Sequence, residues 1–201
     1  MIFWMKLVLN HKKADRYARA IFHFSNGVQI AFIDRRRLGV MWLVDDADSI
    51  VGRLGPEPLA ESFTPHILTQ ALKRHHVPIK AALIDQSLIA GIGNMYADEA
   101  LFAAKIHPLR RADTLSSEEI QSLHCSIQEV LRLAICDKGA SVDTYVRPDG
   151  QLGMAHCSFK VAHRGGKPCC VCGTPIQRIL VRNRGSYLCP NCQPFSTGFL
   201  T

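Results

Sequence analysis

Four cysteines in two Cys-x-x-Cys pairs constrain the fold of this chain more than any other feature of its sequence. Cys169 and Cys172 form the first pair, and Cys189 and Cys192 form the second after sixteen intervening residues. Two such pairs are typical of a tetrahedral site in which four thiolates bind one zinc ion. Because four protein ligands leave no position for water or substrate, the predicted Zn²⁺ is structural and not catalytic.

The segment that carries these cysteines is basic. The 201-residue chain has a formal net charge of +7, and no Asp or Glu follows Asp149. A region with charges of one sign attracts polyanions, because neutralising phosphates releases counterions. Two alternatives explain the same positive charges: they solvate the surface, or they partly compensate the negative charge of the zinc–thiolate centre. The basic residues after Asp149 are Lys160, Arg164, Lys167, Arg178, Arg182 and Arg184.

Residues 176–187, between the cysteine pairs, alternate apolar and basic side chains. This pattern predicts a β-hairpin with one packed face and one charged face. Its tip, near Asn183-Arg184-Gly185, would present a guanidinium group to a phosphate. On this segment alone, a surface hairpin whose arginines only solvate the fold explains the pattern equally well.

The N-terminal part of the chain has the pattern of a β-sheet. Strands are predicted at 17–24 and 28–33, around a turn at Ser25-Asn26-Gly27, and a third strand at 40–44. Glycines and prolines between residues 52 and 58 indicate a linker. The sequence therefore predicts an incomplete β domain over residues 1–51 and a linker over residues 52–62.

Helical patterns follow the linker. The longest predicted helix begins with a capping box formed by Ser116 and Glu119. We expect a helical domain over residues 63–150 and a zinc-finger hairpin over residues 151–201, which makes the chain an α+β protein. The predicted helices span residues 64–76, 79–86, 94–104 and 116–136.

A glycine-rich turn precedes one of these helices. Gly91 and Gly93 flank Ile92 and allow a tight turn, and Asn94 begins the helix. The exposed N–H groups and the positive end of the helix dipole favour an anion at this point. A dinucleotide-binding fingerprint is excluded, because no strand precedes the turn and a third glycine is missing. The motif therefore predicts a phosphate clamp.

A basic turn, residues 34–39 with the sequence Asp-Arg-Arg-Arg-Leu-Gly, follows the predicted hairpin. An arginine beside an apolar side chain can enter a duplex, kink it and fill the space of a displaced base. Arg36 and Leu38 form such a pair. Taken alone, however, the turn is better explained as a solvated surface.

In this order, the motifs resemble those of the formamidopyrimidine-DNA glycosylase and endonuclease VIII family, and most closely its formamidopyrimidine type. The matching segments cover nearly the whole chain: residues 34–39, 54–59, 79–80, 85–86 and 91–99, and the finger that ends Cys189-Pro190-Asn191-Cys192-Gln193. The resemblance implies a β-sandwich domain followed by a helix–two-turn–helix domain with a zinc finger. It also implies base-excision repair by a bifunctional DNA glycosylase and AP lyase that removes oxidised purines, namely formamidopyrimidine and 8-oxoguanine.

The resemblance assigns DNA contacts to individual residues. Asn94 and Arg184 would hold phosphates that flank the lesion, and Lys80 would belong to the same DNA-binding set. The implied partner is double-stranded DNA that contains oxidised bases or abasic sites, bound by a monomer.

Three further positions would fill the gap left by the flipped base. Arg36 and Leu38 match two of them, and Leu7 is the candidate for the third. The family often has Phe where this chain has Leu38, which changes how the wedge would stack on bases.

The chain departs from the family at the catalytic position. The family uses an N-terminal proline, whose amine attacks the sugar C1′ to form a Schiff base, with a glutamate directly after it. Here Ile2 follows Met1, and the first proline is Pro56, an internal residue with no free amine. No residue of this chain is therefore predicted to be catalytic, and the chain as given is expected to be inactive.

Three hypotheses account for this combination. The first is a truncated product, or a start site placed too late, of a glycosylase gene. The second is a catalytically silent protein of the same family that binds damaged DNA. The third, a zinc-ribbon module that binds RNA or protein, leaves the motifs at residues 34–39 and 91–94 unexplained.

The sequence also bears on the compartment. The apolar runs are interrupted by charge before they reach the ~18 residues of a membrane span. No N-terminal stretch has the three parts of a signal peptide. We expect a cytoplasmic bacterial protein with no membrane partner, which associates with the nucleoid when it binds DNA.

Overall fold

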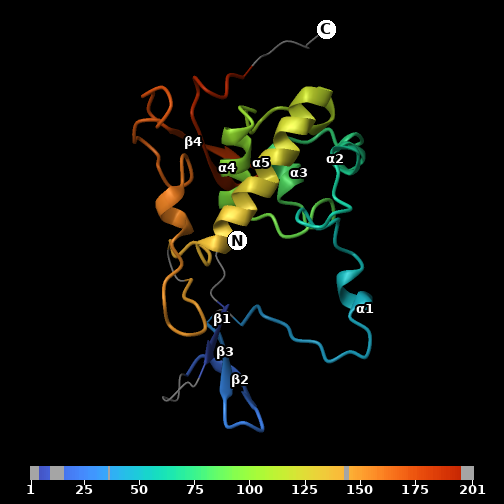
Figure 1. Cartoon of the computed structure of the whole chain (residues 1–201), viewed down its shortest axis with the longest axis vertical. Coiled ribbons are helices and arrows are strands. Elements are labelled where there is room, and N and C mark those ends of the chain that lie inside the picture. The colour runs from blue at the N-terminus through green and yellow to red at the C-terminus, as the bar shows by residue number, and fades with distance from the viewer. Residues whose placement is uncertain (1–4, 10–15, 36, 143–144, 196–201) are drawn as a thin grey trace. The chain divides into compact units, whose positions relative to one another are not determined.

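The computed structural model describes residues 5–9, 16–35, 37–142 and 145–195 (Figure 1). The chain divides into two compact units. The sheet unit contains the residues up to Ala47 together with Leu133–Ser158, and the helix–finger unit contains Asp48–Arg132 and the residues from Phe159 onward. This division differs from the predicted boundaries, because residues 133–158 group with the sheet. Within the described residues, no helix is both long and apolar enough to cross a bilayer.

The sheet unit is built on three antiparallel strands, β1 (Met5–Leu9), β2 (Ala18–His23) and β3 (Gln29–Asp34), in the order β1-β3-β2. The predicted turn between β2 and β3 is confirmed. The Gly27 amide donates to the carbonyl of Phe24 over 3.0 Å, and Gly27 has a φ of +81°, as expected for the left-handed residue of a three-residue hairpin loop.

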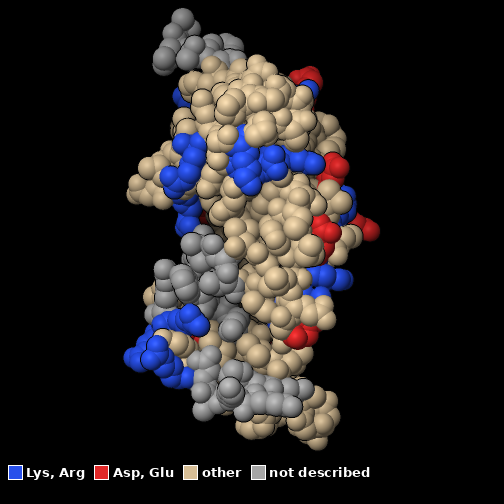
Figure 2. All heavy atoms as spheres, turned by 90° about the vertical axis from the view of Figure 1, so that its left-hand side faces the viewer, with Lys and Arg blue, Asp and Glu red and all other residues tan. Residues whose placement is uncertain are grey.

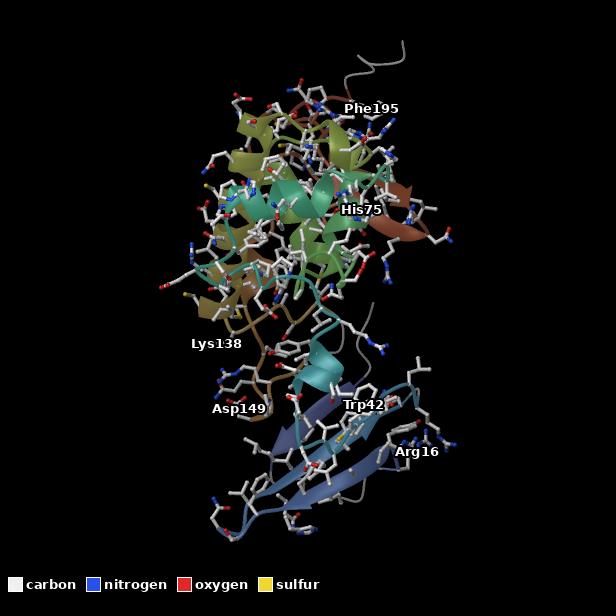
Figure 3. All side chains as sticks on the ribbon, turned by 90° about the vertical axis from the view of Figure 1, so that its right-hand side faces the viewer. Arg16, Trp42, His75, Lys138, Asp149 and Phe195 are labelled. Carbon is white, nitrogen blue, oxygen red and sulfur yellow. The ribbon has the colours of Figure 1, made fainter. Side chains whose placement is uncertain are left out.

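The predicted third strand at 40–44 is wrong, because β1 takes that role. Leu7 of β1 lies opposite Phe32 of β3, so β1 and β2 occupy both edges of the central strand. Residues 40–44 form no strand and are exposed, with Trp42 61% exposed (Figure 3). Among the described residues, this apolar β-forming run therefore has no partner strand.

The helix–finger unit begins with α1 (Asp48–Val51) and α2 (Pro65–Leu72), and α2 is capped by Thr64, whose side chain accepts from the amide of Ile67. The short α3 (Ile79–Leu83) and α4 (Asn94–Ala103) follow, and then a 3-10 turn, η1 (Ala112–Thr114). The long α5 (Ser117–Cys136) has the predicted capping box. Ser116 N donates to Glu119 Oε2 over 2.8 Å, and Glu119 N donates back to Ser116 Oγ over 3.2 Å.

The zinc-finger segment follows a second 3-10 turn, η2 (Ala155–Ser158), which belongs to the sheet unit. Its two strands, β4 (Gln177–Val181) and β5 (Arg184–Leu188), form an antiparallel hairpin. The predicted hairpin between the cysteine pairs is thus confirmed.

One apolar core holds the helices together. Figure 1 shows α5 lying across α3 and α4, and buried side chains from all three helices meet there, among them Leu83, Leu101 and Leu123.

The segment predicted as a linker packs on the helix–finger unit. Gly55 N donates to the carbonyl of Gln86 over 2.8 Å, and a Cβ at Gly55 would lie 2.4 Å from the backbone of Leu88. Glycine is required here because two stretches of backbone touch.

Candidate metal centre and nucleic-acid interface

The four predicted zinc ligands converge. The sulfur atoms of Cys169, Cys172, Cys189 and Cys192 lie within 4.8 Å of one another. Three of the sulfur pairs are separated by 3.4, 3.5 and 3.9 Å. A tetrahedron with Zn–S bonds of about 2.3 Å has edges of about 3.8 Å, so the cluster has the size of a four-thiolate zinc site. The predicted structural Zn²⁺ is confirmed by this geometry and by the family comparison below.

The thiols differ in acidity. Hydrogen bonding to Thr174 lowers the pKa of Cys172 to about 6, whereas burial raises the pKa of Cys189 and of Cys192. Four adjacent thiolates repel one another, and a bound divalent cation supplies the charge that lets all four ionise. The amides of Val171 and Cys192 also point at ligand sulfurs, each 3.5 Å away.

The metal centre is fastened to α4 and the loop after it. Gln193 is 1% exposed; its Oε1 accepts from Cys189 N over 3.0 Å, and its Nε2 donates to the carbonyl of Ile106 over 2.8 Å. Phe102 of α4 packs in an apolar cluster with Cys169, Cys189 and two other residues of the finger. The zinc site therefore fixes the finger to the helical part of the same unit.

Two adjacent acidic residues of α4 receive backbone amides of the finger segment. Glu99 is buried and accepts from the amides of residues 160, 161 and 162 over 2.8 to 2.9 Å. Asp98 is also buried, and its Oδ2 accepts from Tyr187 N of β5 over 3.1 Å. Helix α4 is thus the support on which the finger is placed.

The N-terminus of α4 is open, as the phosphate-clamp prediction requires. Gly93 is the N-cap residue and supplies no side-chain hydrogen bond, and the first backbone bond of this helix joins Ala97 N to Gly93 O. The amides of Asn94 and Met95 lie before this first bond, at the end of the helix where backbone N–H groups have no acceptor within the helix. A Cβ built at Gly93 would meet no atom within 4 Å, so the N-cap position itself faces open space within the described residues.

The glycine-rich turn before α4 is held by Gln86. Its Oε1 accepts from Gly91 N over 2.9 Å, and its Nε2 donates to the carbonyl of Ile92 over 3.0 Å. Gly91 has a φ of +75°, a conformation that glycine adopts without strain. Gln86 thereby fixes the path of the chain into the helix end.

The hairpin brings Arg184 close to this helix end. Arg182 and Asn183 both have positive φ, as the central residues of a type I′ turn do, so the turn lies one residue earlier than predicted and Arg184 begins β5. The carbonyl of the next residue, Gly185, accepts from Asn94 Nδ2 over 2.9 Å. Arg184 itself is exposed. Asn94 is thus bonded to the residue that directly follows Arg184.

Lys80 has a different environment from the exposed one that DNA binding requires. Its side chain is fully buried, and its Nζ lies 2.6 Å from Asp98 Oδ1 and 3.1 Å from the carbonyl oxygen of Gly185. Burial lowers the pKa of Lys80 despite the opposing effect of Asp98, and the nearby positive charge of Arg184 lowers it further. Contact between Lys80 and DNA stays a prediction.

The predicted gap-filling residues belong to the sheet unit. Leu38 is 73% exposed, and the turn that carries it is ordered by Asp34, whose two carboxylate oxygens accept from the amides of Arg37 and Gly39. Leu7 is 47% exposed on β1. Arg36 lies outside the described residues.

The buried polar residues that place the finger were not assigned a role from the sequence. They are Asp98, Glu99 and Gln193. The available signal was two adjacent acidic residues inside an otherwise apolar stretch, residues 97–102, where a charged side chain is buried only if it is paired.

Family models match two parts of the chain. The model of the formamidopyrimidine-DNA glycosylase H2TH domain matches residues 54–146. The model of the zinc finger found in FPG and IleRS matches residues 166–194. Together they cover the α2 to α5 region and the metal centre.

Curated relatives extend the match to nearly the whole chain. Formamidopyrimidine-DNA glycosylase of Symbiobacterium thermophilum is 41% identical over 187 residues, which are 91% of this chain and 61% of the relative. The enzyme of Listeria innocua is 37% identical over 192 residues, which are 94% of this chain and 70% of the relative. The chain thus spans between three fifths and three quarters of the length of these two relatives.

Solved structures agree with these matches. A complex between Lactococcus lactis Fpg and DNA that contains an abasic site superposes with a TM-score of 0.86 at 32% identity, over 96% of this chain and 73% of that chain. MutM (FPG) of Thermus thermophilus gives a TM-score of 0.83 at 35% identity, over 97% of this chain and 78% of that chain. On these grounds, the chain belongs to the formamidopyrimidine-DNA glycosylase family of base-excision repair proteins.

Proposed function

We propose that this chain binds double-stranded DNA at oxidised bases and abasic sites, as the DNA-gripping part of a bifunctional glycosylase and AP lyase. The observation that carries the proposal is the hydrogen bond from Asn94 Nδ2 to the carbonyl of Gly185. It joins the open N-terminus of α4 to the strand that begins with Arg184. A helix N-terminus and a guanidinium group side by side form a site for phosphate oxygens.

Charge supports a polyanionic ligand. Figure 2 looks onto the side of the helix–finger unit that carries β4 and the zinc-binding segment, and it shows groups of Lys and Arg side chains there. The sequence after Asp149 contains no acidic residue. These cations attract a DNA backbone at long range, and the clamp formed by Asn94 and Arg184 then fixes individual phosphates.

The sheet unit contributes the proposed wedge. Leu38 and Leu7 expose apolar side chains that would fill the space vacated by an extruded base, together with Arg36. Similar solved structures support the choice of ligand: one contains a Lactococcus lactis FPG mutant with Fapy-dG DNA, and another contains Lactococcus lactis Fpg with abasic-site DNA.

The family resemblance implies Schiff-base formation at C1′, followed by elimination. A polypeptide of these 201 residues begins Met1-Ile2, and its first proline is internal. Each proline among these residues is internal, so none of them has a free secondary amine. We expect it to recognise damaged DNA without forming a covalent bond to it.

Two assays on the 201-residue polypeptide test the proposal. In a binding titration, we expect a duplex with an abasic-site analogue to bind more tightly than the same duplex intact. In borohydride trapping with 8-oxoguanine or abasic DNA, we expect no covalent adduct. Equal affinity for both duplexes would contradict damage recognition, and a trapped adduct would contradict the absence of a nucleophile.

A further inference from the structure

The Lys80–Asp98 ion pair is the most deeply buried charged contact of the described residues. The two side chains are 0% and 1% exposed, and Lys80 Nζ lies 2.6 Å from Asp98 Oδ1. Removing two charges from water is expensive, and well-packed apolar residues of similar volume often stabilise a fold as well or better. Burial raises the pKa of Asp98 to about 6 in spite of the adjacent ammonium group, which reflects this cost. Net stability is therefore a weak explanation for the pair.

Among the described residues, the other side-chain hydrogen bonds of the pair lead to the finger hairpin. Lys80 Nζ also donates to the carbonyl of Gly185 over 3.1 Å. Asp98 Oδ2 accepts from Tyr187 N over 3.1 Å. The ammonium group of the pair thus binds the Gly185 carbonyl of β5, and its carboxylate binds the Tyr187 amide of the same strand.

The geometry forms a closed ring across three elements. It runs from Lys80 in α3 to Asp98 in α4, on to Tyr187 in β5, and back along the strand through Gly185 to Lys80. Asn94 donates to the same Gly185 carbonyl over 2.9 Å. A slip of the hairpin by one residue would replace the carbonyl that faces Lys80 with an amide, which would leave the ammonium group buried without its second acceptor.

Arg184 directly precedes Gly185, so the ring fixes the point at which its side chain leaves the protein. The hairpin is short, with five residues in each strand, and Arg184 is the first residue after its turn. An isolated two-stranded hairpin is at best marginally stable in water. The position of the guanidinium group relative to Asn94 thus depends on what anchors β5.

We propose that Lys80 and Asp98 are positioning residues, which fix Arg184 at the distance from the N-terminus of α4 that two DNA phosphates require, and that Lys80 does not itself bind DNA. The assignment rests on the phosphate-binding role proposed above for Arg184 and Asn94. Under this assignment, Lys80 contributes to DNA binding through Arg184, which is compatible with the burial of its own side chain.

The test is whether Lys80 acts through Arg184. Affinity for a duplex with an abasic-site analogue is measured over a range of salt concentrations for the 201-residue polypeptide, Lys80→Met, Arg184→Ala and the double variant. Exposed Lys73→Met is the matched control. Lys80→Met should weaken binding roughly tenfold in the parent and have little further effect once Arg184 is absent. If instead both substitutions weaken binding additively and each lowers the salt slope by about one, Lys80 is a phosphate ligand and the assignment is overturned.

Amide exchange supplies a readout that needs no DNA. Loss of the ring should speed exchange of the Tyr187 amide in Lys80→Met and in the isosteric Asp98→Asn, with zinc retained, whereas Lys73→Met should leave it unchanged. Unchanged exchange in both variants would overturn the positioning role. If the parent polypeptide shows no affinity for the abasic-site duplex, the proposed function fails, while exchange still reports whether the pair holds β5.

Discussion

In the helix–finger unit, the segments predicted to meet DNA are tied to α4 by buried side chains, whereas in the sheet unit the turn with Leu38 is ordered by one carboxylate. Glu99 and Asp98 together accept four finger amides, and Asn94 donates to the Gly185 carbonyl. On the sheet side, Asp34 accepts two amides of the turn, from Arg37 and Gly39.

The difference has a physical rationale. A phosphate clamp must match fixed distances along a DNA backbone, and a rigid site loses less free energy on ordering. A wedge fills a gap that opens only when a base leaves the stack, and an exposed apolar side chain suffices for that contact. We therefore expect substitutions in the helix–finger unit to change folding and binding together, and substitutions at the wedge to change damage preference alone.

The largest effect is expected at the metal centre. Cys189→Ser removes a buried ligand, and structural zinc sites contribute on the order of 10 kcal/mol to folding. We expect loss of stoichiometric zinc and of amide protection in β4 and β5, with the sheet unit unaffected. Zinc content and amide exchange measure both, with exposed Cys170→Ser as the control. Full zinc retention in Cys189→Ser would remove this cysteine from the ligand set.

The next effect concerns the attachment of the finger to α4. Glu99→Gln replaces a carboxylate that accepts three amides with a group that has one acceptor oxygen and one NH₂ donor facing them. We expect a loss of about 3 kcal/mol in unfolding free energy, measured by denaturant titration. Exposed Glu61→Gln serves as the control. Equal stability of the two variants would show that Glu99 does not hold the finger.

A pH-dependent effect is expected from Asp98. Its folded pKa of about 6 lies above the ordinary value of 3.8, so the folded state binds this proton more tightly than the unfolded state. Its contribution to stability is therefore fully present below pH 4 and is lost as the pH rises to about 6. Relative to Asp98→Asn, the parent should lose on the order of 2 kcal/mol between pH 4 and pH 7.

Denaturant titrations of both proteins at each pH measure this difference, and pH effects on the zinc ligands largely cancel between them. A parent that instead gains stability over Asp98→Asn as the pH rises would show that attraction to Lys80 outweighs the burial of Asp98.

The smallest effect on stability is expected at the wedge. Leu38 is 73% exposed, so Leu38→Ala should change the unfolding free energy by less than about 0.5 kcal/mol. It should nevertheless reduce the preference for an abasic-site duplex over the intact duplex severalfold. Leu43→Ala, at a fully exposed leucine of the same loop, is the control. Equal preferences in the two variants would remove Leu38 from the wedge.

Local signals predicted much of the helix–finger unit. The capping box at Ser116, the cysteine spacing and the helix start at Asn94 depend on residues a few positions apart, and the structure has all three. The sheet was harder to predict, because strand pairing is non-local. Residues 40–44 have as strong a β pattern as the strand actually used, Met5–Leu9, and only the register with β3 distinguishes them.

The residues that support the site could not be predicted from the sequence, because their contacts are also non-local. Glu99 accepts hydrogen bonds from the amides of residues 160–162, and Lys80 donates to the carbonyl of Gly185. Lys80 and Gly185 are 105 positions apart in the sequence. The family resemblance placed Lys80 in the DNA-binding set, and nothing in its neighbouring residues indicated burial, since most lysines are exposed. The contacts that bury it become visible only once the chain is folded.

The central claim is that the corner formed by α4 and β5 grips DNA phosphates. Arg184→Ala and Lys167→Ala separate this corner from general basic charge, because Lys167 is an exposed cation of the same zinc-finger segment that lies outside the hairpin strands. Binding of an abasic-site duplex is measured by fluorescence anisotropy across salt concentrations. The predicted result is a slope lower by about one, with weaker binding, for Arg184→Ala alone. Identical slopes for the parent and Arg184→Ala, or equal losses in both variants, would contradict the claim.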